Sequence, residues 1–450
     1  MIYLDFSATS PLLPEAKDAM LKVFDTTLGN PSALHTPGQN AHHLIEAARA
    51  DIAKLINADP SEIIFTSGGS EANNTVIYTF RSQNIAISNI EHPSIIEPAK
   101  AYTNFTFLPV DSAGFLQEKA LRSTLASKNS SALISIMLAN NELGTIQPVK
   151  ELAKLAHSHG TYFHTDATQA LGKIPIDVKA LDIDYLTISA HKIGGPVGIG
   201  ALYLKGGKKA IKAFHQNFQS SSISSHHPPI TYVSNQLPYT PLILGGHQEQ
   251  GLRAGTTPVA NIVGFGAAAR YVHRHNLPGL YRTKVKPLRD LLAQRILTEI
   301  PYSSLNTALA GLTPLDVPAA KSPSSSSVPP PLTTPSSPTT ALEHPSPRND
   351  LLPHLLNASF QAAEGESIQL YLDALADIAV STGSACASGD GKPSHVLMAT
   401  TGDAEIAHSS IRFSLAPTTT EQDINIVMQY LPDIVKRLQD ISTIRIKEKS

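Results

Sequence analysis

Short apolar runs alternate with stretches of helical periodicity along the first half of the chain, and this alternation constrains the fold most. In residues 39–56 apolar side chains recur three and four positions apart, which predicts a helix with one buried face. Largely apolar strands separated by helices form mostly parallel sheets that are covered on both faces. The predicted fold class is therefore α/β. The other predicted elements here are strands at 62–65, 84–88, 132–138, 162–165 and 185–189 and helices at 70–80 and 149–158.

The last third of the chain follows a different pattern, with strands set among helices. The terminal helix opens at Thr420 and Asp423, which are spaced like a capping box, and Pro432 is expected to kink or divide it. We therefore expect a large domain over 14–265 and a smaller α+β domain built from 1–13 and 266–450. The predicted elements are strands at 355–360, 378–381 and 410–415 and a helix at 365–375.

Two segments fit neither domain. Residues 314–347 contain 10 of the 33 prolines of the chain, together with many serines. Such a tract neither pairs as a strand nor continues a helix, so we expect a disordered or polyproline-like insert. A second insert, at about 216–241, holds a Ser/His/Pro cluster. Neither insert is expected to carry chemistry.

The charge balance excludes some partners. Lys and Arg number 35 against 37 Asp and Glu, a net charge of −2, so no net field attracts nucleic acid or an anionic membrane. The longest mostly apolar stretch, 259–269, is shorter than the roughly 18 to 20 residues of a membrane-spanning helix and predicts a buried helix. Residues 1–10 lack the pattern of a leader peptide, so a cytoplasmic location is expected.

The chain has one cysteine, Cys386. A single thiol excludes an internal disulfide and a thiolate metal cage, and no metal site is predicted. A lone cysteine is usually a small buried hydrophobe. Here the flanking residues, 381–391, are mostly Gly, Ser, Ala and Thr, which favours a mobile thiol on an exposed loop.

Lys192 is the strongest local signal. It follows the predicted strand 185–189 and precedes the glycine-rich residues 193–200, a turn that is not expected to close into a helix. An exposed loop lysine is the commoner outcome for such a residue. The functional interpretation is an amine at the carboxyl edge of a parallel sheet, able to form a Schiff base with an aldehyde cofactor.

Three further segments decide between these interpretations. Residues 67–71 join a strand to a helix and could cradle a phosphate. Asp166 and Gln169 end another strand, although Asp166 alone could simply cap a helix, and the amides of Asn140 and Asn141 alone could form an ordinary turn. Together they meet the needs of pyridoxal phosphate: an imine-forming lysine, an anion cradle and an acid beside the pyridine nitrogen.

With these residues the sequence resembles the fold-type I, class V aminotransferase-like group. Within that group it resembles the cysteine desulfurases of the bacterial housekeeping and nitrogen-fixation types. The resemblance covers the whole chain except for the two inserts. The motifs that carry it lie at 3–9, 29–32, 91–92, 140–142, 164–169, 191–192, 251–256, 383–386 and 409–414.

The resemblance implies roles for individual residues. Lys192 would be the Schiff-base lysine and Asp166 the partner of the pyridinium nitrogen. Gln169 would bind the phenolic oxygen of the cofactor, and His92 would stack on its ring. Asn141 would belong to both the cofactor site and the substrate site. Together with Arg412 it would position the substrate, with the guanidinium forked onto its α-carboxylate. The phosphate would be held by Gly69, Ser70, Ser189 and His191, and by Thr256 from the neighbouring subunit of a homodimer.

The resemblance also implies a reaction on L-cysteine. Lys192 or His92 would move protons, and the thiolate of Cys386 would take the substrate sulfur as a persulfide while alanine leaves. The persulfide would pass to an acceptor protein, such as an iron–sulfur scaffold or a tRNA-thiolation relay.

Two alternatives stay open at this point. One is a selenocysteine lyase or another class V lyase or aminotransferase. The other is a non-catalytic scaffold in a sulfur-transfer assembly, which would predict the loss of Lys192, Asp166 or Cys386, and all three are present.

Overall fold

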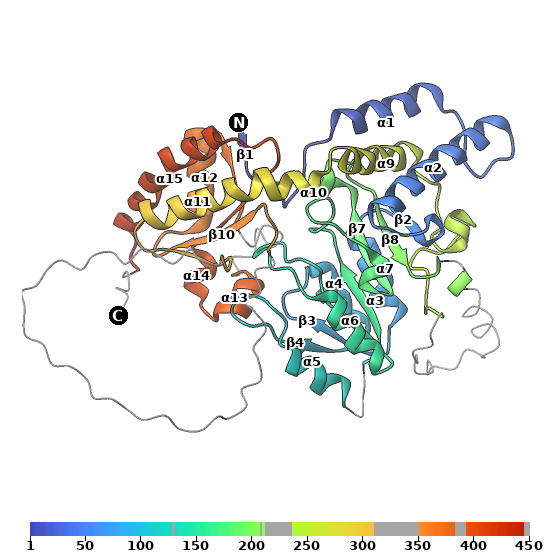
Figure 1. Cartoon of the computed structure of the whole chain (residues 1–450), viewed down its shortest axis with the longest axis horizontal. Helices are drawn as coiled ribbons and strands as arrows, with labels where there is room; N and C mark the ends of the chain where they lie inside the picture. Colours follow the sequence, from blue (N-terminus) through green and yellow to red (C-terminus); the bar gives the residue numbers. More distant parts are fainter. Residues whose placement is uncertain (128–130, 208, 212–235, 310–350, 383–392, 445–450) are drawn as a thin grey trace, which may run out of the picture.

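The computed structural model describes residues 1–127, 131–207, 209–211, 236–309, 351–382 and 393–444. The two larger sheets, each with its own helices, lie side by side, and the helices α9 (Val259–Arg274), α10 (Leu277–Leu280) and α11 (Lys286–Glu299) run from one to the other (Figure 1). The N-terminus lies with the second sheet (Figure 1).

The larger sheet has seven strands in the order β2-β8-β7-β6-β5-β3-β4. β3, β4, β5, β6 and β7 pair in parallel, whereas β8 runs antiparallel to both of its neighbours, so β2 points the same way as β7. The predicted mostly parallel α/β sheet is confirmed. The strands are β2 (Ile63–Thr66), β3 (Asn84–Ser88), β4 (Asn104–Leu108), β5 (Leu133–Ser135), β6 (Tyr162–Asp166), β7 (Tyr185–Ser189) and β8 (Gly200–Leu204).

Helices cover both faces of this sheet, which explains why its central strands are apolar throughout. One apolar cluster joins sheet residues such as Phe163 and Ile188 to α2 (Thr36–Leu55), α6 (Val149–Ser158) and α9. A second cluster joins Ile85 and Tyr185 to α3 (Gly69–Thr79) and α4 (Pro93–Tyr102) on the other face. The remaining elements of this part are α1 (Pro14–Thr26), α5 (Glu118–Leu125), α7 (Val178–Leu181) and the 3-10 turns η1 (Pro60–Glu62), η2 (Ala190–Ile193) and η3 (Gln248–Gly251).

The second sheet is antiparallel, in the order β12-β10-β9, and has a core of its own beneath α11, α12 and α15. A separate parallel pair, β1 with β11, ties the N-terminus to this part. The division into domains 14–265 and 1–13 with 266–450 stays a prediction. The elements are β1 (Ile2–Tyr3), η4 (Tyr281–Val285, one π turn), β9 (Ser303–Leu305), β10 (Leu355–Phe360), α12 (Gly365–Ala376), β11 (Ile378–Ala379), α13 (His395–Thr401), α14 (Ala404–His408), β12 (Ser410–Ser414) and α15 (Glu421–Ile441).

The predicted capping box of α15 is present, since Thr420 Oγ1 accepts the Asp423 N–H and Asp423 Oδ2 accepts the Thr420 N–H. The expected division at Pro432 is wrong, because α15 runs through it as one helix. One apolar face of α15 is buried on both sides of the proline, and this packing outweighs one missing backbone hydrogen bond.

The predicted inserts lie mostly outside the described residues, 314–347 entirely so. The end of the second insert, 236–241, is described, and it packs against the larger sheet. Leu237 and Tyr239 are buried, and the backbone oxygens of Gln236 and Pro238 accept hydrogen bonds from the hydroxyls of Tyr162 and Tyr185. This end of the insert is therefore part of the core.

The predicted buried helix at 259–269 is confirmed as part of α9. Within the described ranges, no helix combines the length and the apolar character needed to cross a bilayer.

Candidate active site

The carboxyl ends of β2, β3, β5, β6 and β7 lie at one edge of the larger sheet, because these strands run in the same direction. Most of the predicted site residues lie at or just after these strand ends: Gly69, Ser70, His92, Asn141, Asp166, Gln169, Ser189, His191 and Lys192. Ligand sites of open α/β sheets form at this edge. The structure therefore gathers residues that are more than a hundred positions apart in the sequence.

Lys192 lies on η2, directly after β7. Its turn does close, as a single 3-10 turn, which corrects the expectation of an open loop. Gly194 ends the turn with φ +77°, and a Cβ there would lie 2.6 Å from Leu13 Cγ, so only glycine fits this stop. Lys192 Nζ donates to the carbonyl oxygens of Ser7 (2.5 Å) and Ala8 (2.8 Å), which aims the amine at the N-terminal segment.

A second amine, that of Lys173, contacts the backbone of this turn. Its side chain is 2% exposed and its Nζ donates to the backbone oxygen of Lys192, which also accepts from Ser10 Oγ at 3.1 Å. Burial, and secondarily the nearby Lys192 ammonium, lowers the pKa of Lys173 to about 7. The turn that carries Lys192 is thus held from two sides.

Asp166 ends β6 and is 7% exposed. Its Oδ1 accepts the Thr168 backbone N–H at 2.9 Å, so it does cap the turn that follows. Its Oδ2 accepts from Asn73 Nδ2 at 2.7 Å, which fixes the carboxylate against α3. Capping does not exclude the predicted role, because a carboxylate that accepts these two hydrogen bonds still has lone pairs for a further donor.

His92 caps the N-terminus of α4, with Nδ1 accepting the Ser94 backbone N–H at 3.1 Å. Burial lowers the pKa of the imidazole, and the Lys192 and His395 charges add to this effect while Asp166 opposes it. The ring is consequently neutral at pH 7. His395 Nε2, on α13, donates to the Glu91 backbone oxygen at 2.9 Å, and this contact joins α13 to the His92 turn.

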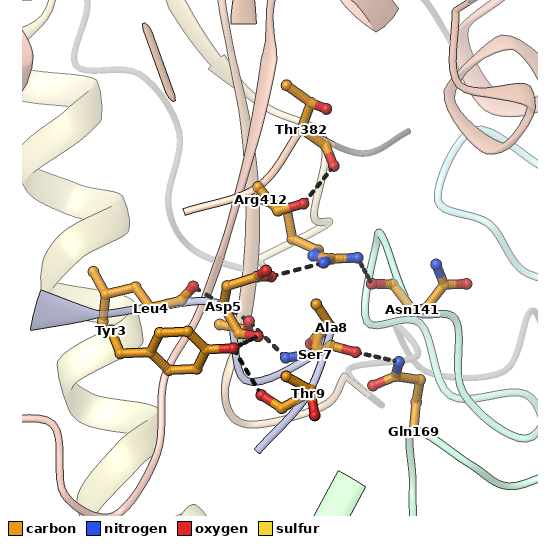
Figure 2. A network of polar contacts seen from close by, with 12 residues as sticks. Tyr3, Leu4, Asp5, Ser7, Ala8, Thr9, Asn141, Gln169, Thr382 and Arg412 are labelled. Carbon is orange, nitrogen blue, oxygen red and sulfur yellow. Dashed lines mark hydrogen bonds and ion pairs between the residues drawn. The ribbon is translucent and has the colours of Figure 1, made fainter. Parts of the chain in front are cut away.

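Arg412, on β12, reaches the site from the second sheet (Figure 2). The side chain is 3% exposed. Its Nη2 forms an ion pair with Asp5 Oδ1 at 2.9 Å, and its Nη1 donates to the backbone oxygen of Asn141 at 3.1 Å. Asn141 is therefore beside Arg412, as the predicted substrate site requires.

Several buried polar atoms at this edge have no hydrogen-bond partner among the described residues: Gln169 Oε1, Thr168 Oγ1 and Arg412 Nε. Gln169 Nε2 donates to the Ser7 oxygen at 3.0 Å (Figure 2), which leaves its second N–H for an acceptor. Buried polar atoms without partners are costly, so a polar ligand suits this edge. The chemistry of the donor set fits pyridoxal phosphate, with amide, carboxylate, imidazole and amine groups at one sheet edge.

The predicted phosphate cradle forms where α3 begins. Gly68 precedes the helix with φ +156° and offers no side-chain cap to the first-turn N–H groups. A Cβ on Gly69 would lie 3.2 Å from Thr168 Oγ1 and 3.8 Å from Ser189 Cβ, so the start of α3 lies against the end of β7. Uncapped N–H groups and the helix dipole favour an anion here.

Two further predicted phosphate ligands, Ser70 and His191, differ in their surroundings. Ser70 is exposed in the first turn of α3, and it lines an open cleft together with His92 and Asn74. His191 Nδ1 lies 3.2 Å from Thr9 Oγ1, and burial lowers the pKa of His191 to about 4, so this ring is neutral.

Two predicted residues are not joined to the site by the described contacts. Thr256 is exposed beyond η3, and its expected role across a dimer is not tested by a single chain. Cys386 lies outside the described residues. The roles given to all of these residues stay predictions.

Sequence reasoning missed the residues that hold the predicted ones: Asp5, Ser7, Ala8, Asn73 and Ser94. The segment 3–9 belongs to a motif that carries the family resemblance, but backbone carbonyls leave no trace in residue types. Asn73 could have been found from its place one helical turn after Gly69, on a face shared with the cradle.

Comparison with known families shows the family of this protein. The family model described as "Aminotransferase class-V" matches residues 2–307 and 336–427. The chain belongs to the class-V aminotransferase family. Among its relatives, "Cysteine desulfurase IscS" of Dictyoglomus turgidum is 38% identical over 98% of this chain and 96% of that protein. The mitochondrial cysteine desulfurase of Saccharomyces cerevisiae is 37% identical over 98% of this chain and 76% of that protein.

Solved structures of similar proteins have the same fold. A NifS-like protein of Rickettsia africae superposes with a TM-score of 0.75 at 29% identity, covering 98% of this chain and all of that one. A protein described as "SspA in complex with cysteine" gives 0.68 at 27% identity, covering 93% of this chain and all of that one. The predicted fold, the cysteine desulfurase activity of this class-V family member and its cofactor, pyridoxal phosphate, are confirmed.

Proposed function

We propose that the cysteine desulfurase activity is carried by Lys192, Cys386 and His92, with Asp166 beside the pyridine nitrogen of the cofactor. The observation that supports this most is the convergence of Lys192, Asp166 and Arg412 at one sheet edge, although they come from two sheets. In this assignment Gln169 binds the phenolic oxygen. The phosphate is held by Gly69, Ser70, Ser189 and His191.

The remaining residues bind and orient the substrate. Arg412 binds the α-carboxylate of L-cysteine, with Asn141 beside it, because a guanidinium retains N–H groups beyond the two that contact Asp5 and Asn141. When bound, pyridoxal phosphate withdraws electrons from the α-carbon of the substrate and so makes bonds at that position labile. Lys192 or His92 moves the proton at that carbon.

We assign sulfur transfer to Cys386. Its thiolate attacks the substrate sulfur, and the new S–S bond forms as the Cβ–S bond breaks. The electron pair stays with carbon, which takes a proton to give alanine, and the enzyme keeps a persulfide. The chain on either side of 383–392 supports this role: Ser381 pairs with the backbone of Arg412, and Ser394 Oγ lies 2.5 Å from Glu142 Oε2.

The proposal extends to partners and location. The persulfide sulfur goes to acceptor proteins in iron–sulfur cluster assembly or tRNA thiolation. The protein is a cytoplasmic homodimer in which Thr256 of one subunit completes the phosphate site of the other. Thr256 is exposed in the single chain, as a residue that serves a second copy must be.

Alanine release from L-cysteine tests the core of the proposal. The loaded wild-type enzyme is compared with Lys192→Ala, with Asp166→Asn and with the control Lys205→Ala, whose ammonium forms an ion pair with the surface carboxylate of Asp182. We expect loss of alanine formation in Lys192→Ala, a fall of at least a hundredfold in Asp166→Asn, and wild-type rates in the control. Full activity of Lys192→Ala would refute the assignment.

A further inference from the structure

Two donors meet at one ring nitrogen of His92. The Ser94 backbone N–H donates to Nδ1 at 3.1 Å, and Ser94 Oγ lies 2.8 Å from the same nitrogen. A backbone N–H can only donate, so Nδ1 must present its lone pair. A neutral imidazole with an unprotonated Nδ1 carries its proton on Nε2.

The neighbouring contacts fix the direction of the hydroxyl. Asn73 Nδ2 donates to Ser94 Oγ at 2.8 Å and to Asp166 Oδ2 at 2.7 Å. An amide nitrogen has two N–H groups and no acceptor, so both are used by these contacts. Ser94 Oγ therefore accepts from Asn73 and turns its own hydrogen toward His92 Nδ1. The result is an ordered chain that runs from the Asp166 carboxylate to the imidazole.

The residues of this hydrogen-bond chain are held in place by the fold. Asn73 is 1% exposed on α3, Ser94 lies in the first turn of α4, and Asn74 Nδ2 also donates to the Ser94 backbone oxygen at 3.3 Å, so the two helices are tied at this point. A proton placed on Nδ1 would face the Ser94 N–H, donor against donor. His92 consequently cannot gain a second proton there without leaving its place at the start of α4.

We propose that Asn73 and Ser94 are positioning residues that hold His92 as its Nε2–H tautomer. His92 then acts at the site as a hydrogen-bond donor, and Lys192 alone is the base that takes the proton from the substrate. The assignment of Lys192 as the base rests on the proposed function. The tautomer of His92 does not, because the hydrogen bonds that set it are present in the protein without cofactor.

Nitrogen-15 NMR of histidine side chains in the full-length protein tests the tautomer directly. Spectra are recorded at pH 7 with pyridoxal phosphate bound and after its removal, and a His92→Gln spectrum identifies the His92 signals among the 18 histidines. We expect an unprotonated Nδ1 and a protonated Nε2 in both forms. A protonated Nδ1, or an imidazolium ring, would overturn the proposal.

Variants separate positioning from simple structural support. Ser94→Ala and Asn73→Ala each remove a link of the chain, and Thr75→Ala is the control, because it loses only a helical hydrogen bond to the Glu71 oxygen on the same helix. Ser94→Ala removes a donor to the neutral ring, so the acidic limb of the pH profile of kcat/KM should move to higher pH. We expect kcat/KM to fall by about five- to tenfold.

The outcomes distinguish this inference from the proposed function. Unchanged His92 signals and an unshifted pH profile in both variants, as in Thr75→Ala, would make Asn73 and Ser94 merely structural and overturn the inference. Full desulfuration with a protonated Nδ1 would refute the inference and leave the proposed function intact. The expected His92 signals in a protein that forms no alanine would refute the proposed function and leave the tautomer standing.

Discussion

Arg412 illustrates how the site works at the scale of single residues. A guanidinium that is 3% exposed needs a counter-charge and hydrogen-bond acceptors, and Asp5 and the Asn141 oxygen supply both. Both contacts use terminal nitrogens, while Nε is unpaired in the described part of the chain. The planar fork thus has donors left for a substrate carboxylate, which an ammonium group would not have in this geometry.

Arg412→Lys should therefore weaken substrate binding while preserving the charge. We expect KM for L-cysteine to rise by about tenfold or more, since one charge-assisted hydrogen bond contributes about 1.5 to 3 kcal/mol. Arg295→Lys is the matched control, because Arg295 pairs with Glu299 on the surface of α11. An unchanged KM in Arg412→Lys would remove Arg412 from the carboxylate site.

Glu91 gives a residue-scale prediction about pH. Complete burial raises its pKa to about 8, although the Ser88 hydroxyl and the Met137 N–H oppose the shift. The native state therefore keeps a proton that the unfolded chain has lost above its ordinary pKa. The stabilisation from this proton is complete at low pH, declines from about pH 4.5 upward and disappears above about pH 8.

Glu91→Gln lacks this titration. Relative to wild type, the variant should gain about 3 kcal/mol in free energy of unfolding between pH 6 and pH 9. Denaturant unfolding at the two pH values measures the gain, with Glu97→Gln on the exposed side of α4 as the control. A pH-independent difference between Glu91→Gln and wild type would show that Glu91 is ionised in the folded protein.

At the scale of elements, local chemistry makes some features predictable. The capping box of α15, the apolar face of α2 and the strands β3 and β7 follow from residue types and spacing, and their bounds agree with the prediction or differ by only a few residues. β8 was missed because its residues follow a glycine-rich turn, and its antiparallel direction depends on pairing with β7 and β2. Pro432 was misjudged because packing, not propensity, decides the course of α15.

The residues of the site also differ in how far the sequence reveals them. Roles for Lys192, Asp166 and Arg412 could be proposed from the sequence because the proposed chemistry needs side chains of these types. The residues that aim them act through backbone oxygens, as Ser7 does, or through contacts between distant elements, as Asp5 and Asn73 do. Such contacts depend on the tertiary structure and are invisible in a single sequence.

The cap of α15 gives a prediction at this scale. Thr420→Ala removes the hydroxyl that accepts the Asp423 N–H, and we expect a loss of about 1 kcal/mol in free energy of unfolding with no change in KM. Thr298→Ala, at an exposed position of α11, should cost clearly less. An equal loss in both variants would mean that the capping box does not stabilise α15.

At the scale of the whole molecule, the N-terminal segment joins the two sheets at the site. Ser7 N donates to Ser414 Oγ of β12 at 2.9 Å, while the Ser7 oxygen accepts from Lys192 and Gln169 of the larger sheet. Asp5 links the same segment to Arg412 (Figure 2). The proposed substrate-binding and cofactor-binding groups are thus connected by one short stretch of chain.

Cofactor binding should therefore stabilise the whole molecule, since it gives partners to buried polar atoms such as Gln169 Oε1. We expect a higher Tm for the loaded enzyme than for the cofactor-free enzyme, and a smaller difference in Asp166→Asn than in the control Asp182→Asn, whose carboxylate is 60% exposed. Calorimetry measures both. An equal Tm increase in the two variants would place Asp166 outside the cofactor site.

The central claim is that sulfur from L-cysteine passes through the single thiol of the chain. Mass spectrometry of the loaded enzyme after incubation with L-cysteine measures this directly, together with the visible absorption of the cofactor and the alanine released. We predict one added sulfur atom on the peptide that contains Cys386. Cys386→Ser should lose this sulfur and alanine formation while the cofactor band is retained. Continued alanine release by Cys386→Ser, or an unmodified Cys386 in a wild-type enzyme that turns over, would contradict the account.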